Sequence, residues 1–499
     1  MEKRVPEVGM SELERIVEPT GPDGRPRAIG RDRPDAERAL DRRRFLGGAA
    51  LVGVAAMACG GGPALGVSAR PGGLGRETGG PTGYSSDAYL NVRSFGARGD
   101  GMADDTAAIQ KALDAAGKQG GNVVLLPTGR YLVGGSLRVP RYVTLQGVFR
   151  APTSTQPLDL ERGSCLLAVG GKGKADGEPL ISMSENATLY GLKVFYPEQT
   201  CPDPPVEYPW TVRYAGNNGN ASVVNVTLVN PWQGVHFGPV AGGRYYIHGL
   251  YGQPLKTGLF IEHSYDTTRV EDVHFWPFWR FGKTGRWTTN EATAFRIGRA
   301  DWLYMLNCFC IWYKIGYHFI HSAPGKVPGG SPGGDPNVVL TQCGADGGWT
   351  GTKPTAVRVD ACQNPQGISF VNGQFDSYPG GPTVAVGPRN SGPVKFTNCG
   401  FWSGPDIDTI AVLEGSGNTT FMGCQFPSWG QKNRRAPAIL LRSGRLTVEG
   451  CEFMEAGKAQ AVIEHGAEGA VVVGNHFYGP ARITNQAGDK AVIGLNAVG

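Results

Sequence analysis

A short pattern recurs along the chain from about residue 190 and restricts the folds that it can adopt. Each copy has a Gly, Asn or Asp, once a Gln, then a small or apolar residue, any residue, and an apolar or aromatic one. The copies start every 23 to 35 residues, at Gly191, Asn225, Gly249, Asp272, Asn307, Gln342, Asn372, Asn398, Gly423, Gly450 and Gly474.

Each unit also carries an earlier strand-like segment with alternating apolar residues, as at 234–237, 355–359 and 438–441. We expect two or three short strands per unit with no helix between them. Strands this short bury an apolar face only by stacking on the strands of neighbouring units. The sequence therefore predicts an all-β fold, a parallel β-helix of about a dozen coils spaced by about 4.8 Å.

Composition narrows the class of protein further. Gly and Pro, at 77 and 36 residues of 499, make up more than a fifth of the chain, and only 18% of it is charged, against about 25% in typical domains. This balance disfavours a helical bundle. Lys and Arg total 48 against 43 Asp and Glu, which is too close to neutrality for a general electrostatic hold on nucleic acid.

The N-terminal region has the pattern of an export signal. Arg42, Arg43 and Arg44 precede an uncharged run over 45–58, which is too short to span a bilayer. The run resembles a twin-arginine signal, so residues 1–58 are predicted to direct export to the periplasm or outside the cell. Cys59 follows a segment similar to a lipoprotein cleavage site, and cleavage there would leave the exported protein with a lipid anchor at Cys59.

The remaining chain divides at about residue 86. Residues 59–86 are rich in Gly, Pro and Ser and almost free of large apolar residues, as in a flexible tether. Residues 87–499 are expected to form the β-helix.

Five cysteines fall at one position of the recurring pattern. They are expected to stack inside the solenoid as small apolar residues, with parallel side-chain vectors that suit disulfides poorly. No cysteine spacing indicates a zinc site. These five are Cys308, Cys343, Cys399, Cys424 and Cys451.

The start of the folded region, at 91–101, 104–113 and 121–131, closely resembles the opening of the pectate-lyase-like superfamily. That superfamily includes polygalacturonase-like, rhamnogalacturonase-like and epimerase-like proteins. The resemblance implies a right-handed β-helix that acts on polysaccharides. The residue constellations of polygalacturonase active sites do not occur in the helix body, so no functional residue is transferred.

A helix is expected just after Asp104 and Asp105, which occupy N-cap positions. Its apolar stripe has helical spacing and consists of Ala108, Ile109, Ala112, Leu113 and Ala116. This helix is predicted to cap the N-terminal end of the solenoid, where strand edges would otherwise be exposed. The Asp104–Asp105 pair is therefore expected to be structural.

The candidate catalytic residues come from reading outward-facing positions coil by coil, since alternate residues of a strand face out. One column reads Trp276, Ile311, Asp346, Asp376 and Trp402. Two carboxylates on adjacent coils suit glycoside hydrolysis, with one protonated as general acid and the other ionised as base or nucleophile. The flanking tryptophans suit sugar rings. His274 and Gln374, one outward position earlier, are candidate hydrogen-bonding residues. The alternative is that both aspartates begin solvated turns.

A second outward column would form a positive strip suited to uronate carboxylates or sulfates. Glu262 and Asp360 lie two residues further along their coils, three coils apart, which is too far for partners in catalysis. An ordinary charged sheet surface is the alternative. The column reads His236, Phe260, Arg296, His318 and Arg358.

Three functions remain open. The first is an exported glycoside hydrolase that uses Asp346 and Asp376 and needs no cofactor or metal. The second is a polysaccharide lyase acting on uronates, in which the same aspartates would bind Ca²⁺ and an Arg or His of the strip would act as base. The third is a non-catalytic glycan-binding surface protein. In each, the expected partner is a polysaccharide or oligosaccharide, and the sequence does not determine the oligomeric state.

Overall fold

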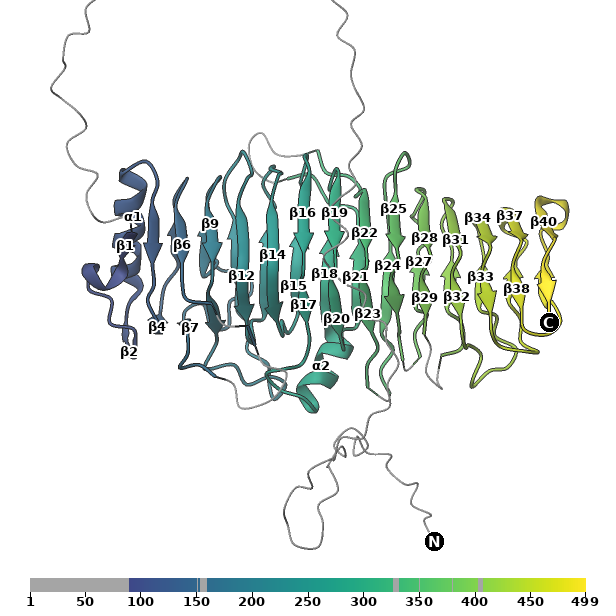
Figure 1. Cartoon of the computed structure of the whole chain (residues 1–499), viewed down its shortest axis with the longest axis horizontal. Helices are drawn as coiled ribbons and strands as arrows, with labels where there is room; N and C mark the ends of the chain where they lie inside the picture. Colours follow the sequence, from purple (N-terminus) through teal and green to yellow (C-terminus); the bar gives the residue numbers. More distant parts are fainter. Residues whose placement is uncertain are drawn as a thin grey trace, which may run out of the picture. The chain divides into compact units, whose positions relative to one another are not determined.

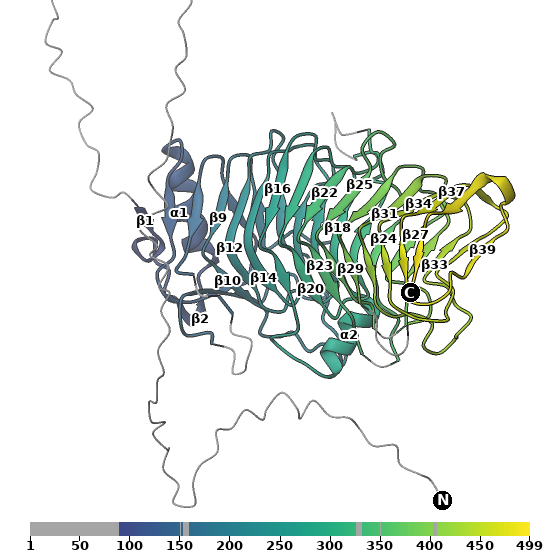
Figure 2. The ribbon, with the colours of Figure 1, turned by 45° about the vertical axis from the view of Figure 1, so that its right-hand side comes forward.

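The computed structural model describes residues 89–149, 151–152, 159–325, 332–349, 351–378, 380–402 and 407–499. The predicted export signal, Cys59 and the tether lie outside these residues. The strands of the described region are joined by parallel pairings, coil upon coil. Figure 1 shows the strands stacked in chain order, from α1 at one end to β40 at the other, and Figure 2 shows the same stack turned by 45°.

One sheet has 13 strands, which pair with one another in chain order. Its strands are β5 (Leu137–Val139), β8 (Ile181–Met183), β11 (Trp210–Tyr214), β13 (Gln233–Phe237), β15 (Thr257–Ile261), β18 (Thr293–Ile297), β21 (Ile315–Phe319), β24 (Thr355–Val359), β27 (Val384–Val386), β30 (Ala411–Leu413), β33 (Ile439–Leu441), β36 (Ala461–Ile463) and β39 (Ile483–Asn485).

A second sheet of 28 strands consists of two parallel ladders, which share the long strands β12 (Ser222–Leu228) and β14 (Tyr246–Gly252). The first ladder adds β1 (Tyr89–Asn91), β3 (Val123–Leu125), β6 (Thr144–Gln146), β9 (Thr188–Tyr190), β16 (Thr268–Glu271), β19 (Leu303–Leu306), β22 (Val338–Thr341), β25 (Ile368–Val371), β28 (Val394–Thr397), β31 (Asn418–Met422), β34 (Gly444–Glu449), β37 (Ala467–Val473) and β40 (Ala491–Gly494). The second adds β2 (Asp100–Asp104), β4 (Gly129–Val133), β7 (Ser164–Ala168), β10 (Lys193–Phe195), β17 (His274–Phe275), β20 (Phe309–Ile311), β23 (Gly344–Asp346), β26 (Gln374–Phe375), β29 (Gly400–Phe401), β32 (Gln425–Phe426), β35 (Glu452–Phe453), β38 (His476–Phe477) and β41 (Ala497–Val498).

The first residue of every recurring pattern lies at the bend between these two ladders. All eleven residues, from Gly191 to Gly474, have φ between 52° and 72°. This left-handed region is open to Gly and tolerated by Asn and Asp, because their short side chains bond locally. The turn conformation explains the Gly, Asn and Asp of the pattern, and Gln342, at φ 54°, is its least suited member.

The next residue of the pattern points into the solenoid, as predicted for the five cysteines, all of which are buried and free of disulfides. Two of their thiols also accept hydrogen bonds between coils. Cys399 Sγ accepts the backbone N–H of Gly373, and Cys451 Sγ accepts that of Cys424, both at 3.4 Å. Asn475 continues the column and accepts the N–H of Cys451 at 2.9 Å.

The N-terminal end carries the expected helix, α1 (Thr106–Lys118), and the predicted stripe is buried at Ile109, Ala112, Leu113 and Ala116. The side chains of Asp104 and Asp105 accept different hydrogen bonds, although both residues were expected as N-caps. Asp104 Oδ1 accepts the N–H of Thr106 at 2.9 Å. Asp105 is the N-cap residue by position, but its carboxylate accepts the N–H groups of Arg98 and Gly99 instead. Both aspartates are structural here.

A second helix, α2 (Lys283–Glu291), lies within the connection from β17 to β18 (Figure 1). The expectation of no helix between strands is therefore wrong for this coil. The helix is held on the coils by its aromatic residue, since Trp287 Nε1 donates to the backbone oxygen of Leu255 at 3.0 Å. Neither α1 nor α2 is long and apolar enough to cross a bilayer, and no other helix of the described residues is.

The left-handed turn generates a stability prediction at Gln342, whose side chain is exposed. Gln342→Gly should raise the free energy of unfolding by up to about 1 kcal/mol, because glycine removes the steric cost of positive φ. Gln342→Val should lower it, because a branched side chain increases that cost. Thermal melts followed by circular dichroism measure both variants. Thr341→Gly, within β22, is the control and should be destabilising; equal losses for both glycine variants would contradict the explanation.

Candidate functional site

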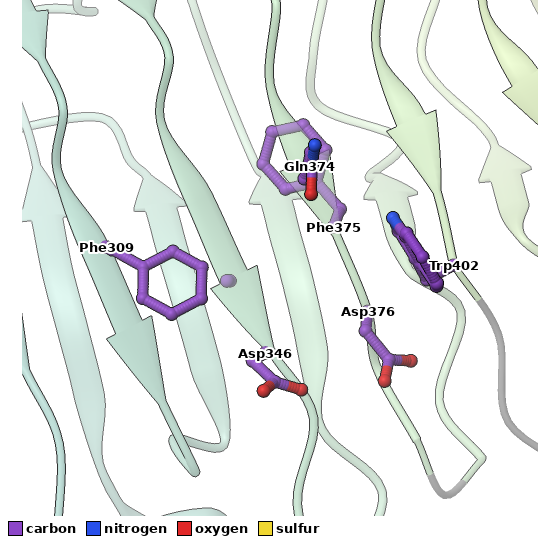
Figure 3. Close-up of a pocket in the computed structure, with 7 residues that line it drawn as sticks. Phe309, Asp346, Gln374, Phe375, Asp376 and Trp402 are labelled. Atoms are coloured by element: carbon purple, nitrogen blue, oxygen red, sulfur yellow. The ribbon is translucent and has the colours of Figure 1, made fainter. Parts of the chain in front are cut away.

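The pairing register places the predicted catalytic column in one line across adjacent coils. Ile311 pairs directly with Asp346. Ala345 pairs with Phe375, and Phe375 with Phe401, so the residues that follow, Asp346, Asp376 and Trp402, lie in consecutive coils. Neighbouring strands are about 4.8 Å apart, which brings the two aspartates close together. Figure 3 shows both carboxylates on the same side of the sheet, with Trp402 beyond Asp376.

These residues line a hollow of about 240 Å³, which we call the acidic hollow. Gly344 lies between Phe309 and Gln374 of the adjoining coils, and the Phe309 ring occupies the space that a side chain at Gly344 would need. A Cβ at Gly344 would approach the Phe309 ring to 2.9 Å. The hollow is lined by Phe309, Ala345, Asp346, Gln374, Phe375, Asp376 and Trp402.

The two carboxyl groups have different environments. Asp376 is half-buried, and desolvation together with the charge of Asp346 raises the pKa of Asp376 to about 6. A hydrogen bond from the backbone N–H of Tyr378, at 2.9 Å, favours the ionised form but does not offset burial. Asp346 lies at the exposed rim, and desolvation by its surroundings also raises its pKa. Asp376 therefore holds a proton in mildly acidic solution.

Two of the predicted sugar-binding residues lie outside the acidic hollow. Trp276 is separated from Asp346 by Ile311, and its ring packs 4.4 Å from that of His274 and 4.9 Å from that of Phe278, centroid to centroid. Burial lowers the pKa of His274 to about 4, so its imidazole is neutral above that pH. Gln374 and Trp402, in contrast, border the hollow directly.

The second predicted column lies on the 13-stranded sheet, apart from the aspartate pair on the 28-stranded sheet. Its register is as expected, with His236 opposite Phe260, then Arg296, His318 and Arg358 in successive coils. The positive strip and the aspartate pair are therefore brought to different sheets.

Carboxylates neutralise much of this strip. His236 Nε2 lies 3.0 Å from Glu262 Oε1, and burial lowers the pKa of His236. At the other end, His318 Nε2 lies 2.9 Å from Asp360 Oδ2, and Arg358 Nε lies 3.1 Å from Asp360 Oδ1. These hydrogen bonds, that of His318 first, hold the pKa of Asp360 at about 2.

Arg296 is the cation of the strip with no ion pair to any residue within the described ranges. Its guanidinium lies 4.6 Å from the centre of the Phe260 ring, and its buried Nε lacks a hydrogen-bond partner there. The strip thus retains one unpaired cation, and its role in substrate binding stays a prediction.

The sequence analysis did not single out Phe309, which lines the acidic hollow, or Gly344, which leaves room for the Phe309 ring. The signal was present, because both residues belong to the outward column that contains His274 and Gln374. Within the described residues there is no group of three or more His, Cys, Asp or Glu side chains placed to hold a metal ion.

Comparisons with known proteins agree with this architecture. Residues 89–158 match the family model for "Rhamnogalacturonase A/epimerase, pectate lyase-like". A mutant tailspike protein of E. coli bacteriophage HK620, in complex with a pentasaccharide, superposes with a TM-score of 0.52 over 83% of this chain and 78% of the tailspike, at 10% identity. This likeness concerns the fold alone. The pectate-lyase-like resemblance and the right-handed parallel β-helix are confirmed.

The curated relatives that match are carbohydrate-active enzymes, and each match is short. Alginate lyase 7 of Azotobacter vinelandii is 62% identical over 45 residues, which are 9% of this chain and 5% of the relative. A probable glucan endo-1,3-beta-glucosidase of Arthroderma benhamiae is 41% identical over 63 residues, 13% of this chain and 7% of the relative. The chain thus matches less than a tenth of each relative's length.

The raised pKa of Asp376 generates a second stability prediction. Below pH 3.8 the carboxyl is protonated in folded and unfolded chains, whereas above about pH 6 the folded chain must ionise a shielded group, and this lowers its stability. Asp376→Asn should therefore raise the melting temperature at pH 8 and have little effect at pH 4. Asp489→Asn, at an exposed site, is the control. A pH-independent difference between Asp376→Asn and the native chain would contradict the assigned pKa.

Proposed function

We propose that the chain hydrolyses glycosidic bonds of a polysaccharide, with Asp376 as general acid and Asp346 as its ionised partner. The observation that carries this proposal is the placement of the two carboxyl groups on adjacent coils, over one hollow, with the pKa of Asp376 raised to about 6. Glycoside hydrolysis requires two such groups, one protonated and one ionised.

Asp376 would donate its proton to the glycosidic oxygen as the bond from that oxygen to the anomeric carbon breaks. Burial and the charge of Asp346 favour the protonated form of Asp376 in the free protein, so this carboxyl would carry its proton before substrate binds. Asp346 would then stabilise the positive charge that develops on the sugar, either by attacking the anomeric carbon or by taking a proton from the attacking water.

The walls of the acidic hollow suit a sugar ring. Trp402 is 60% exposed beside the carboxylates and offers its indole face for stacking. The exposed amide of Gln374 both donates and accepts hydrogen bonds, as sugar hydroxyls require. Relatives with lyase, epimerase and glucosidase names support a carbohydrate substrate. We also propose that the protein acts after export, as its predicted signal implies.

The proposal predicts the effect of removing each carboxylate. Asp376→Asn and Asp346→Asn should each lower kcat/KM by about 10²- to 10⁴-fold, while Asp489→Asn retains full activity. Mass spectrometry of the products from a panel of neutral and uronic polysaccharides gives the second readout, and saturated fragments are expected. Unsaturated ends would indicate a lyase, and undiminished activity in both aspartate variants would refute the assignment.

The pH dependence of kcat/KM follows from the proton on Asp376. Because a general acid must be protonated, activity should fall as pH rises above about 6, the pKa assigned to this carboxyl. In Asp346→Asn the neighbouring charge is gone, so the fall in residual activity should begin at lower pH. A profile that is level to pH 8 in the native chain would exclude Asp376 as the acid.

A further inference from the structure

A second hollow, of about 530 Å³, adjoins the acidic hollow on the same sheet and shares its walls Gln374 and Trp402. We call it the amide hollow. The outward column here reads Phe309, Gly344, Gln374, Gly400 and Gln425, with a glycine in every second coil. The two glycines are thus about 9.5 Å apart along the coil stack.

Gly400 leaves space that protein atoms do not fill. A Cβ there would find its nearest neighbour, Trp402 Nε1, at 3.6 Å, which is ordinary contact, and the backbone is not in the left-handed region. Nothing in the local fold therefore requires glycine at this position. The absence of a side chain opens the surface beside the Trp402 indole.

The chemistry of the amide hollow differs from that of its neighbour. The polar side chains lining it are amides, namely Asn372, Asn398, Gln374 and Gln425, and none of its described lining residues is charged. Asn398 Nδ2 donates to Asn372 Oδ1 at 2.9 Å, which orients both amides, and within the described residues Asn372 Nδ2 and Asn398 Oδ1 have no other hydrogen-bond partner. Paired donors and acceptors beside an indole face match the hydroxyls and ring of a neutral sugar.

We propose that the amide hollow is a subsite for a neutral sugar of a glycan chain that runs along the coil stack. This inference rests on the proposed function and adds its substrate class. The described lining of the two hollows contains two carboxylates and no Lys, Arg or His. A uronate would bring negative charge to a site that offers it no cation, whereas a neutral hexose unit meets only hydrogen-bonding and stacking groups.

Binding is measured by calorimetry on the full chain carrying Asp376→Asn, so that hydrolysis does not consume the ligand. The probes are hexasaccharides of neutral glucan, xylan and mannan, with mannuronate and galacturonate hexamers for comparison. We expect at least one neutral hexamer to bind more tightly than both uronate hexamers. Adding Gly400→Leu should weaken that binding about tenfold by filling the hollow.

Gly469→Leu is the matched control, because Gly469 also lies in a strand with open space at its Cβ, the nearest atom being 3.7 Å away. It should leave binding unchanged. Gln425→Ala removes an amide from the wall without filling the space, and it should weaken binding as well. This variant tests the subsite even if Gly400→Leu fails to fold.

Preference for a uronate hexamer, absence of binding by every neutral hexamer, or equal affinities in Gly400→Leu and Gly469→Leu would overturn the subsite. Binding without hydrolysis by the native chain would instead refute the hydrolase while the subsite stands.

Discussion

The left-handed turn residue between the two ladders of each coil is the constraint on which the rest of the structure depends. Its positive φ turns the chain by a fixed amount, so the next residue points inward and the one after it outward. Eleven repetitions keep the same residue positions aligned from coil to coil. Alignment then builds both the buried cysteine column and the outward columns that carry the candidate site.

This alignment is why much of the architecture could be predicted from the sequence. Strand alternation alone placed Asp346, Asp376 and Trp402 in one outward column, and the pairing register agrees. The capping helix also followed from its apolar spacing. Helix α2 could not be predicted in this way, because it lies in a connection that the repeat does not govern. Its position depends on contacts with several coils, as in the hydrogen bonds that its side chains donate to the backbone oxygens of Cys201 and Leu255.

Charge was harder to predict than position. A column of His236, Arg296, His318 and Arg358 reads as a positive strip, but the sequence does not show which cations meet a carboxylate. Glu262, at the end of its strand, contacts His236, and Asp360, at the end of its own, contacts His318 and Arg358. Within this strip, Arg296 is therefore the residue that forms no ion pair with any described residue. A column specifies which residues are neighbours, whereas net charge depends on side-chain directions and on burial.

In the proposed hydrolase, the same features of the acidic hollow would set both the acid strength of Asp376 and the charge of the substrate. Shielding from water raises the pKa of Asp376 because no cation among the described lining residues offsets it. A substrate carboxylate about 5 Å from ionised Asp346 would be opposed by about 3 kcal/mol at an effective dielectric constant of about 20. A cation placed to relieve that repulsion would also lower the pKa of Asp376 and ionise the acid. Under the proposed function, a protonated general acid and a charged sugar would therefore make opposing demands on this hollow, and a lining without cations would suit the protonated acid.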